Sequence, residues 1–491
     1  MIYFLVGLFA VGVLLPSYLN FSDYLAWVLV VTTGGLFLYG IISRILGGST
    51  KIIAVAILAC LFAALGIVRM QGVAGVDHVQ IQSFNGNFAK VEGMVMTFPE
   101  QRETRGRIVL GDVLINNTSV NNFNVLVWHD RGEGVSIKDQ VIVEGVLQVP
   151  EDFETTQGRT FEYGNYLAKD KIYLEMFDPS KFAIIPYDGF SIVRFLENLK
   201  KTFISRMESV LPEPHSSLAG GILLGEKQSL GNIWQEKFRI AGLTHIVVLS
   251  GYNISIVVAV ILYLLGFLSI LWSSVFSVLG IVFFALLVGG GSTVIRASVM
   301  ASLLILARFL HRPYYALRGL FIAGFVMVLF NPLILTRDLS FQLSFLATLG
   351  IILFTPVADK IFKRVPQKLG LREIMVTTFS AQLFVFPWII YVIGDFSVVS
   401  FLTNILVLPA IPFAMLASFV AGVIPFYFVA LPAYWLLDYT LFITEKISSI
   451  PYASVTIPPI PLWSVIIVYG LLLWVVLIFG KENEEPHRPT S

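Results

Sequence analysis

Residues 242–258 read GLTHIVVLSGYNISIVV and place a histidine, a serine, a glycine, a tyrosine and an asparagine inside an otherwise apolar run. Polar groups are costly in a bilayer, so a membrane protein that carries several there generally uses them. His245 and Tyr252 would share one face of an unbroken helix, whereas His245 and Ser250 would not. Ser250-Gly251 is a plausible break, which membrane depth tolerates only within protein or beside water. The stretch predicts a cavity or pore wall, with a Ser/Gly packing notch as the alternative.

The composition is that of a polytopic α-helical membrane protein. Of the 491 residues, 56% are hydrophobic and 13% are charged, and the mean hydropathy is +0.81, whereas soluble domains carry about 25% charged residues. The single cysteine, Cys60, excludes an intrachain disulfide. The first apolar run has no basic segment before it and a second run after it. We therefore expect a retained transmembrane helix there rather than a cleaved signal peptide.

Apolar runs divide the chain into parts. Three runs come first, at 2–19, 24–46 and 52–68, and about nine follow residue 240. Because about 20 apolar residues span a bilayer as a helix, we expect about twelve spans. The amphipathic segment between them suits either the membrane interface or ordinary packing. The predicted parts are N-terminal membrane helices (1–70), a β-domain (71–190), amphipathic helices (191–239), a membrane block (240–480) and a tail (481–491).

The β-domain is recognised by period-two alternation, as in NVLVW (124–128) and QVIVEG (140–145). About five short strands separated by turn residues predict a small all-β barrel of the OB type, or another small β-domain. Residues 71–190 hold 10 Lys/Arg and 17 Asp/Glu, a net charge of −7, which is a poor footprint for nucleic acid. A local DNA-binding patch is still conceivable, with Trp128 stacking on bases; the alternative is a solvated hairpin with core aromatics. The cationic candidates, on one apparent loop, are Arg102, Arg105 and Arg107.

The orientation follows from the bias of Lys and Arg between loops. Basic residues gather near 43–51, 311–318 and 360–372 and in the tail. Placing all four in the cytoplasm agrees with three spans before the β-domain and nine after it. We therefore expect the β-domain outside the cytoplasm and the C-terminus inside it.

Several local patterns follow one another in the apolar block. They are GLTH into LSG (242–251), GGGSTVIRASVM (289–300), Asn331-Pro332, DLSFQLSF (338–345), Ala381-Gln382 before Pro387, and Asn404 before Pro409 and Pro412. Together they resemble the competence domain of the ComEC family, the inner-membrane DNA-uptake channel of transformable bacteria. In the β-domain, FEYGNYLA (161–168) looks like the family signature near the end of its OB-fold domain. The resemblance covers nearly the whole chain and implies a cell-membrane location.

The chain departs from this family pattern in two ways. After the Ser-Gly pair the family usually has leucine and histidine, whereas here Tyr252 and Asn253 follow, which puts a second-histidine role in doubt. Family members often end in a metallo-β-lactamase-like nuclease domain, but the six histidines here form no H-x-H-x-D-H cluster and no zinc-ligand spacing. We therefore expect a form without that domain, no metal or cofactor, and no enzymatic activity.

The candidate residues in the block are polar side chains within apolar runs. Arg296 follows a Gly-Gly-Gly run and could contact strand phosphates, extend to the interface, or pair with Asp338. Asp338 and Gln342 are four apart and could face the path or form an interhelical hydrogen-bond network. The predicted channel-lining or substrate-contacting residues are His245, Ser250, Tyr252, Asn253, Arg296, Asp338, Gln342, Gln382 and Asn404.

The leading hypothesis for function is a channel that passes single-stranded DNA inward. No G-x-x-x-x-G-K-[ST] loop is present, so an ATP-driven motor, a nuclease and an external DNA receptor would be separate proteins. One alternative is an intramembrane hydrolase that uses Ser250 and His245, although an i, i+5 spacing does not bring nucleophile and base within ~3 Å. The other is a secondary transporter for a small solute.

Overall fold

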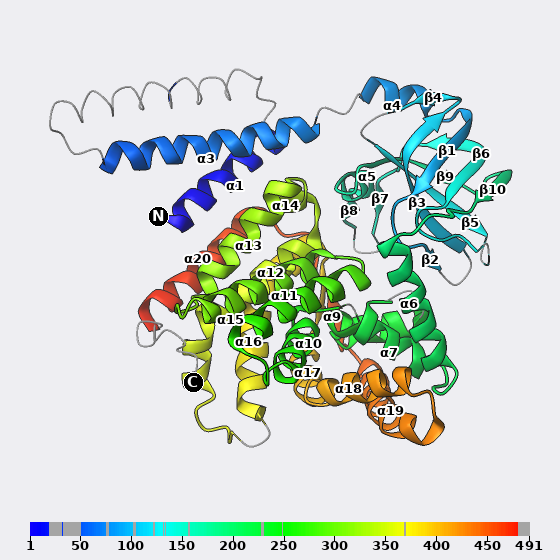
Figure 1. Cartoon of the computed structure of the whole chain (residues 1–491). Helices are drawn as coiled ribbons and strands as arrows, with labels where there is room; N and C mark the ends of the chain where they lie inside the picture. The colour runs from blue at the N-terminus through cyan, green and yellow to red at the C-terminus, as the bar shows by residue number, and fades with distance from the viewer. Residues whose placement is uncertain are drawn as a thin grey trace.

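The computed structural model describes residues 1–18, 32 and 51–479, apart from residues 75–77, 102–104, 121–122, 131, 133, 156–157, 227–229, 248 and 368–369. Two N-terminal helices come first, then a β-barrel, and then a large helical block (Figure 1). The predicted span at 24–46 and the predicted tail at 481–491 lie outside the described residues.

The two N-terminal helices, α1 (Ile2–Tyr18) and α3 (Lys51–Ala74), pack against each other. A Cβ on Gly12 would overlap the backbone of Ala63, and a Cβ on Gly66 would overlap the backbone of Phe9. Small residues permit such close crossings between apolar helices in a membrane. The first and third of the apolar runs predicted before the β-domain are thus helical.

The β-domain is a closed barrel. Strand β1 shows why it forms: its side chains alternate between buried and accessible positions. Pairing runs β1–β3–β5–β9–β6 and returns to β1, antiparallel except between β5 and β9. A closed five-stranded barrel with this order is of the predicted OB type. The barrel strands are β1 (Phe88–Val95), β3 (Arg105–Ile115), β5 (Asn124–Asp130), β6 (Gln140–Gln148) and β9 (Ile172–Phe177).

Smaller elements complete this domain. Helix α4 places Ile81 and Phe84 on the barrel core. A short hairpin and helix α5 connect β6 to β9. Three further strands extend the sheet beside β3 and β6. These elements are α4 (His78–Phe84), β2 (Glu100–Gln101), β4 (Thr118–Ser119), β7 (Phe153–Glu154), β8 (Thr160–Phe161), α5 (Tyr163–Ala168) and β10 (Lys181–Ile185).

Three helices link the barrel to the block: α6 (Ile192–Glu208), α7 (His215–Leu224) and α8 (Gly231–Ile240). Helices α6 and α8 are amphipathic, as predicted for 191–239. The prediction is wrong for α7, in which every residue is buried. Its sequence HSSLAGGILL is rich in small residues, so neighbouring helices can close around it on all sides.

The block contains eleven described helices after the short α9 (Thr244–Val247), and a two-stranded ribbon of β11 (Asp395–Ser397) and β12 (Ser454–Thr456). Four of these helices contain a proline, in the interior at Pro356, Pro387 and Pro432 and in the first turn of α18 at Pro412. The helices are α10 (Gly251–Leu264), α11 (Ile270–Leu287), α12 (Ser292–Phe309), α13 (Ala316–Phe330), α14 (Ile334–Arg337), α15 (Leu339–Ile361), α16 (Leu371–Val392), α17 (Ser400–Val407), α18 (Ile411–Val423), α19 (Tyr427–Ser448) and α20 (Leu462–Phe479).

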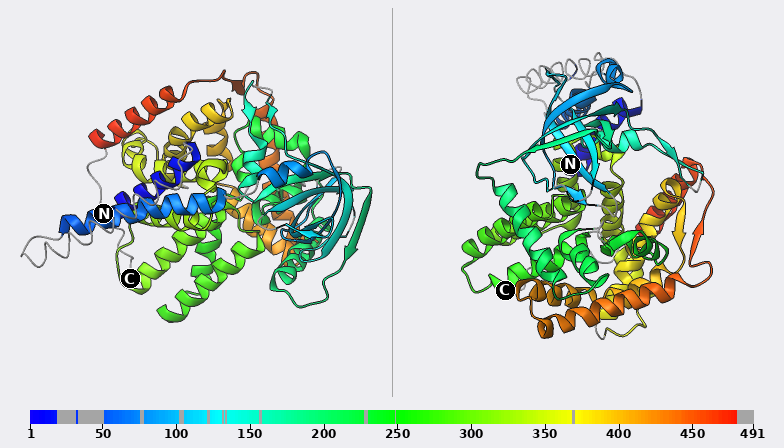
Figure 2. Two further views of the ribbon diagram at one scale, coloured as in Figure 1. Left: turned by 90° about the horizontal axis from the view of Figure 1, so that it is seen from above. Right: turned by 90° about the vertical axis from the view of Figure 1, so that its right-hand side faces the viewer.

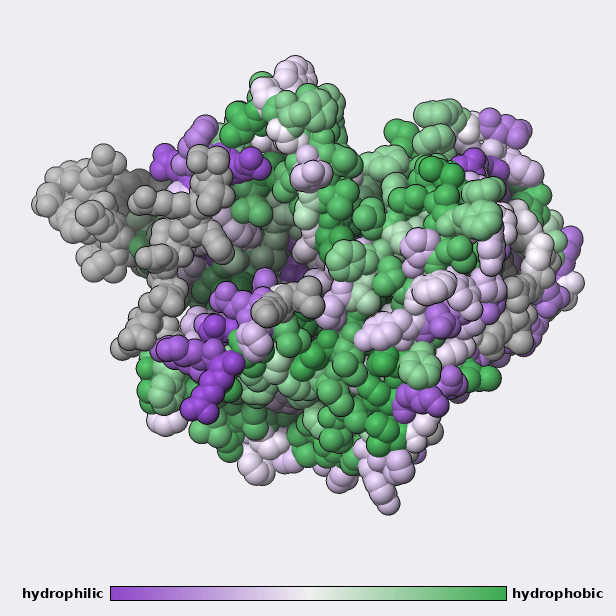
Figure 3. Space-filling model, turned by 90° about the horizontal axis from the view of Figure 1, so that it is seen from below, coloured by the Kyte–Doolittle hydropathy of each residue, from purple (hydrophilic) through white to green (hydrophobic). Residues whose placement is uncertain are grey.

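Seven described helices are long and apolar enough to cross a membrane, and α17 with α18 forms a pair bent by 50° that brings the number to eight. Helices α1, α10 and α13 are apolar but shorter. Large apolar side chains point outward from α11 and α20, for example Trp272 and Trp474. Figure 3 shows broad apolar areas in the middle of the face seen from below, between clusters of hydrophilic residues. The chain is therefore an integral membrane protein with a β-domain, and twelve spans stay a prediction.

The barrel lies at one end of the helical block. It sits above α6 and α7 in Figure 1, and the right-hand view of Figure 2 again places it opposite α18 and α19. Helix α5 contacts α14 at the junction. The junction therefore brings the segment between β6 and β9 against the start of α15.

Candidate functional site

The helix that carries the 242–258 stretch is broken at the predicted place. Helix α9 ends at Val247, and α10 begins at Gly251 with Ser250 as its N-cap. The Ser250 hydroxyl accepts a hydrogen bond from the Asn253 backbone N–H at 3.3 Å, which is a normal capping contact. The buried Asn253 side chain donates to the Ile222 carbonyl on α7 at 3.1 Å. Ser250 and Asn253 therefore stabilise the break itself.

His245 occupies an unusual position at this break. His245 is solvent-accessible although it lies deep among protein atoms, with Asn404 of α17 beside it. A residue on the lipid-facing surface would have neighbours on one side only. A side chain that is accessible and yet deep within the helical block is expected to border a gap between the helices. Tyr252, in the first turn of α10, is also exposed, at 42%.

Ser400 connects the predicted residues Gln382 and Asn404. Gln382 of α16 donates to the Ser400 hydroxyl at 2.9 Å, and Asn404 donates to the Ser400 carbonyl at 2.8 Å. A Cβ on Gly242, whose φ is +72°, would overlap the Ser400 side chain. The buried Asn404 Oδ1 has no hydrogen-bond partner among the described residues, and His245 is its neighbour. His245, Gln382, Ser400 and Asn404 form one polar cluster (the Ser400 cluster), which joins α9, α16 and α17.

Arg296 is buried in α12 and is held by neutral groups of α15. Its Nε donates to the Ser344 hydroxyl at 2.7 Å, and its Nη1 donates to the Thr348 hydroxyl at 2.5 Å. It neither extends to the interface nor pairs with Asp338, so both structural alternatives considered for it are wrong. The preceding glycines, Gly289 and Gly290, have φ of +87° and +63°, as expected of an unwound connection.

Asp338 contacts groups other than Arg296. It is the N-cap of α15, accepts from the Ser340 backbone N–H at 3.0 Å and from the Ser292 hydroxyl, and lies 3.7 Å from Lys169 Nζ of the β-domain. The expectation that Asp338 and Gln342 share a helix face is corrected, because Asp338 precedes the helix. Gln342 instead donates to the last carbonyls of α14 and accepts from the Trp388 indole at 2.9 Å.

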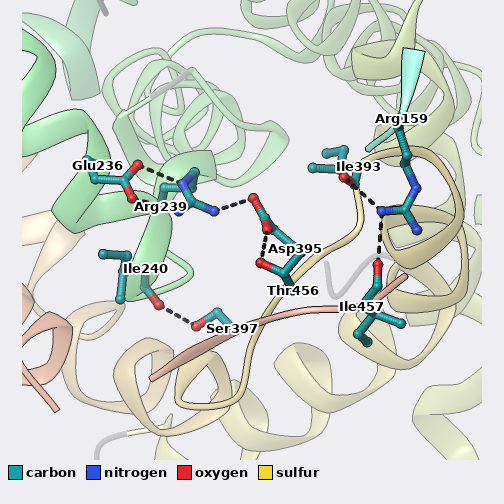
Figure 4. A network of polar contacts seen from close by, with 9 residues as sticks. All are labelled: Arg159, Glu236, Arg239, Ile240, Ile393, Asp395, Ser397, Thr456 and Ile457. Carbon is teal, nitrogen blue, oxygen red and sulfur yellow. Dashed lines mark hydrogen bonds and ion pairs between the residues drawn. The ribbon is translucent and has the colours of Figure 1, made fainter. Parts of the chain in front are cut away.

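A second contact between the β-domain and the block was missed from the sequence. The Arg159 guanidinium donates to five backbone carbonyls at 2.8–3.4 Å. They belong to Ile390, Tyr391 and Ile393 at the end of α16 and to Ile457 and Pro458 after β12. Figure 4 shows two of them, Ile393 and Ile457. A helix C-terminus attracts cations. The available signal was the position of Arg159 and Lys169 on either side of the 161–168 signature.

The ribbon of β11 and β12 is fastened on its other side by α8. Arg239 pairs with Asp395, which also accepts from Thr456 at 3.2 Å, and the Ser397 hydroxyl donates to the Ile240 carbonyl at 2.7 Å (Figure 4). Hydrogen bonding to Arg239 also lowers the pKa of the Glu236 carboxyl. The ribbon thus links the barrel, α8 and the helices that hold the Ser400 cluster.

The barrel residues proposed for DNA are engaged with other groups. Arg102 lies outside the described residues, and Arg105 and Arg107 are on strand β3 rather than on a loop. Arg105 pairs with Asp178 at 2.6 Å and Arg107 with Glu100 at 3.2 Å. Trp128 is buried and stacks on Phe177. Burial raises the pKa of the neighbouring Glu175 carboxyl. This geometry favours core aromatics and paired charges, and DNA binding here stays a prediction.

Ser250 and His245 do not form a hydrogen-bonded pair. The Ser250 hydroxyl is bonded to Asn253 and not to the His245 ring, whereas nucleophilic catalysis requires a base at hydrogen-bond distance. In the part of the chain that the structure describes, no group of His, Cys, Asp and Glu has the arrangement of a metal site.

Comparisons with known proteins place this block in a family. The family model described as "Competence protein" matches residues 222–482, more than half of the chain. A relative from Bacillus subtilis (strain 168), "ComE operon protein 3", is 26% identical over 282 residues, 57% of this chain and 35% of that protein. A second, from Aquifex aeolicus (strain VF5) and described only as "Uncharacterized protein", is 31% identical over 160 residues, 32% of this chain and 38% of that protein.

The chain thus aligns with little more than a third of the length of either relative. No solved structure matches it. The family match covers the broken helix α9–α10, Arg296, Asp338 and the Ser400 cluster. The chain belongs to the competence protein family.

Proposed function

We propose that this protein passes single-stranded DNA into the cytoplasm across the cell membrane during natural transformation. The observation that carries the proposal is the exposed His245 ring within the family-matched helical block, at a helix break and beside Asn404. An accessible polar ring at a helix break is costly in lipid, which favours a polar path at this position. The similarity to ComE operon protein 3 supports a role in competence.

The polar side chains suit a charged strand. His245, Tyr252 and the Ser400 cluster supply hydrogen-bonding groups near the α9–α10 break. Residues 240–411 hold 10 Lys/Arg and 4 Asp/Glu, a net charge of +6. A positive surplus raises the local concentration of a polyanion. The DNA receptor, nuclease and motor belong to other proteins in this proposal.

The test of the proposed function is a deletion in the native host. We expect the deletion strain to bind labelled DNA at its surface but to deliver none to the cytoplasm, and a plasmid copy to restore delivery. The matched control is a copy with Lys181→Ala, which alters a different ion pair of the barrel, with Glu144. Unchanged uptake and transformation in the deletion strain would refute the channel.

The accessibility of His245 gives a direct prediction. After Cys60→Ala, we expect His245→Cys to react with a membrane-impermeant thiol reagent, because the position is solvent-accessible and in this proposal lines the path. Ile254→Cys is the matched control on the adjoining helix, since Ile254 is 1% exposed. Labelling is measured by mass shift of the purified protein. Equal protection of both cysteines would show that His245 does not face water.

The orientation gives a second prediction. With the β-domain outside the cytoplasm, protease added to intact cells or spheroplasts is expected to cut near residues 100–160 and to leave the 360–372 loop intact. The positive loops near 311–318 and 360–372 motivate this orientation. Fragments are identified by mass spectrometry. Cleavage near 100–160 in inverted vesicles alone would reverse the topology.

A further inference from the structure

We infer that Arg296 is the centre of an anion site within the helical block, and that its ligand is one phosphodiester group of the passing strand. This inference deepens the proposed function and rests on it for the identity of the strand. The site itself is an anion site built by α10, α12 and α15, and simple anions can test it separately.

The charge of Arg296 is not neutralised within the protein. The side chain is 7% exposed, and its bonded partners are the hydroxyls of Ser344 and Thr348 and the sulfur of Met300. No carboxylate of the described residues lies within ion-pair distance, because Asp338 is held by Lys169 and Ser292. A buried cation without a counter-charge costs several kcal/mol, so a function other than stability explains it better.

The free end of the guanidinium faces a helix start. Nη2 has no hydrogen bond to any residue that the structure describes, and it lies so close to Gly251 that a Cβ there would overlap it. Gly251 is the first residue of α10, whose N-terminus carries a partial positive charge. Arg296 itself is in the second turn of α12, near another N-terminus. Two helix N-termini and a guanidinium together repel cations and attract an anion.

A purely structural role makes the opposite prediction for one substitution. The Arg296 Nη1 lies 3.7 Å from the Met300 sulfur, one helical turn away. Met300→Glu would place a carboxylate beside the guanidinium at i, i+4. If Arg296 only joins α12 to α15, this new ion pair is neutral or stabilising. If Arg296 receives a phosphate, the carboxylate occupies the site and competes with it.

The experiment measures binding of a fluorescent oligothymidine to the full-length protein in detergent over a series of salt concentrations. For Arg296→Gln we expect about tenfold weaker binding, and a slope of log affinity against log salt that is shallower by about 0.7, the value for one phosphate contact on a single strand. Arg296→Lys keeps the charge and should keep the slope. Met300→Glu should behave like Arg296→Gln, whereas Met300→Gln, its uncharged match, should resemble the wild type.

Inorganic phosphate is the second probe, read as a rise in the thermal midpoint. We expect phosphate to stabilise the wild type and Met300→Gln more than Arg296→Gln and Met300→Glu. If the protein binds phosphate but not the oligothymidine, the anion site at Arg296 is supported and the proposed passage of single-stranded DNA is refuted. The anion site would be refuted if Arg296→Gln had the same salt slope as the wild type. It would also be refuted if Met300→Glu and Met300→Gln bound oligothymidine equally and were stabilised equally by phosphate. If Arg296→Gln does not fold, the comparison of Met300→Glu with Met300→Gln tests the site by itself.

Discussion

Arg159→Ala is expected to lower the free energy of unfolding by roughly 3 kcal/mol or more, because each buried carbonyl left without a partner costs about 1–3 kcal/mol. Five carbonyls surround the guanidinium, and the side chain is 9% exposed. Water can reach some of these carbonyls after truncation, so the expected loss of stability is smaller than the sum of five such penalties. The measurement is thermal unfolding of the detergent-purified protein followed by tryptophan fluorescence.

Arg105→Ala is the matched control, since it removes another arginine of the same domain. Arg105 and Asp178 form a pair whose side chains are 43% and 54% exposed, and exposed pairs contribute about 0–1 kcal/mol. Arg159→Lys should fall between the two, because an ammonium cannot reach all the carbonyls that the planar guanidinium spans. Equal stability of the Arg159→Ala and Arg105→Ala variants would show that Arg159 does not hold the junction.

Gly394 approaches the same contact from the other side. Its φ is +88°, and a Cβ there would overlap the Arg159 guanidinium. Gly394→Ala alone should therefore destabilise the junction, and its effect should shrink in the Arg159→Ala background, where the overlap is gone. Such non-additivity is expected only of residues in contact.

Features set by short-range pattern were predictable. The alternation in NVLVW and QVIVEG appears as β5 and β6 of the barrel. The Ser250-Gly251 pair is the break between α9 and α10. In each case neighbours along the chain determine the outcome, as strand periodicity and N-caps do. Helix α7 was mistaken for an amphipathic helix because small residues do not reveal how many sides are covered.

The partners of the polar residues could not be predicted in the same way. Arg296 is bonded to Ser344 and Thr348, 48 and 52 residues away. Asp338 was expected to share a helix face with Gln342, but it precedes α15 as its N-cap and pairs with Lys169 of the β-domain. Arg159 had no visible role until its carbonyl partners were placed. Spacing rules apply within one helix or strand, whereas these contacts depend on how separate elements pack.

Asp338→Ala is expected to cost about 3–5 kcal/mol, the range found when one partner of a buried ion pair is removed. The Asp338 and Lys169 side chains are 4% and 13% exposed, so the Lys169 ammonium would be left without its counter-charge. The substitution also uncaps α15 and deprives Ser292 of its acceptor. Asp338→Asn keeps one acceptor oxygen, which can still cap the Ser340 N–H, but places a donor NH2 where the other oxygen accepted from Ser292, so its effect should be milder than that of Asp338→Ala. Unfolding of the purified protein measures each variant.

The double variant separates the ion pair from the cap. Lys169→Met in the Asp338→Ala background removes the stranded cation and should restore part of the lost stability, although Lys169→Met alone is expected to destabilise. The remaining deficit is then the cap and the Ser292 contact. Because Lys169 belongs to the barrel and Asp338 to the helical block, this coupling energy also measures how much the pair contributes to the contact between the barrel and the block. Additive effects of the two substitutions would mean that the pair does not connect them, and Arg159 would carry that connection without Lys169.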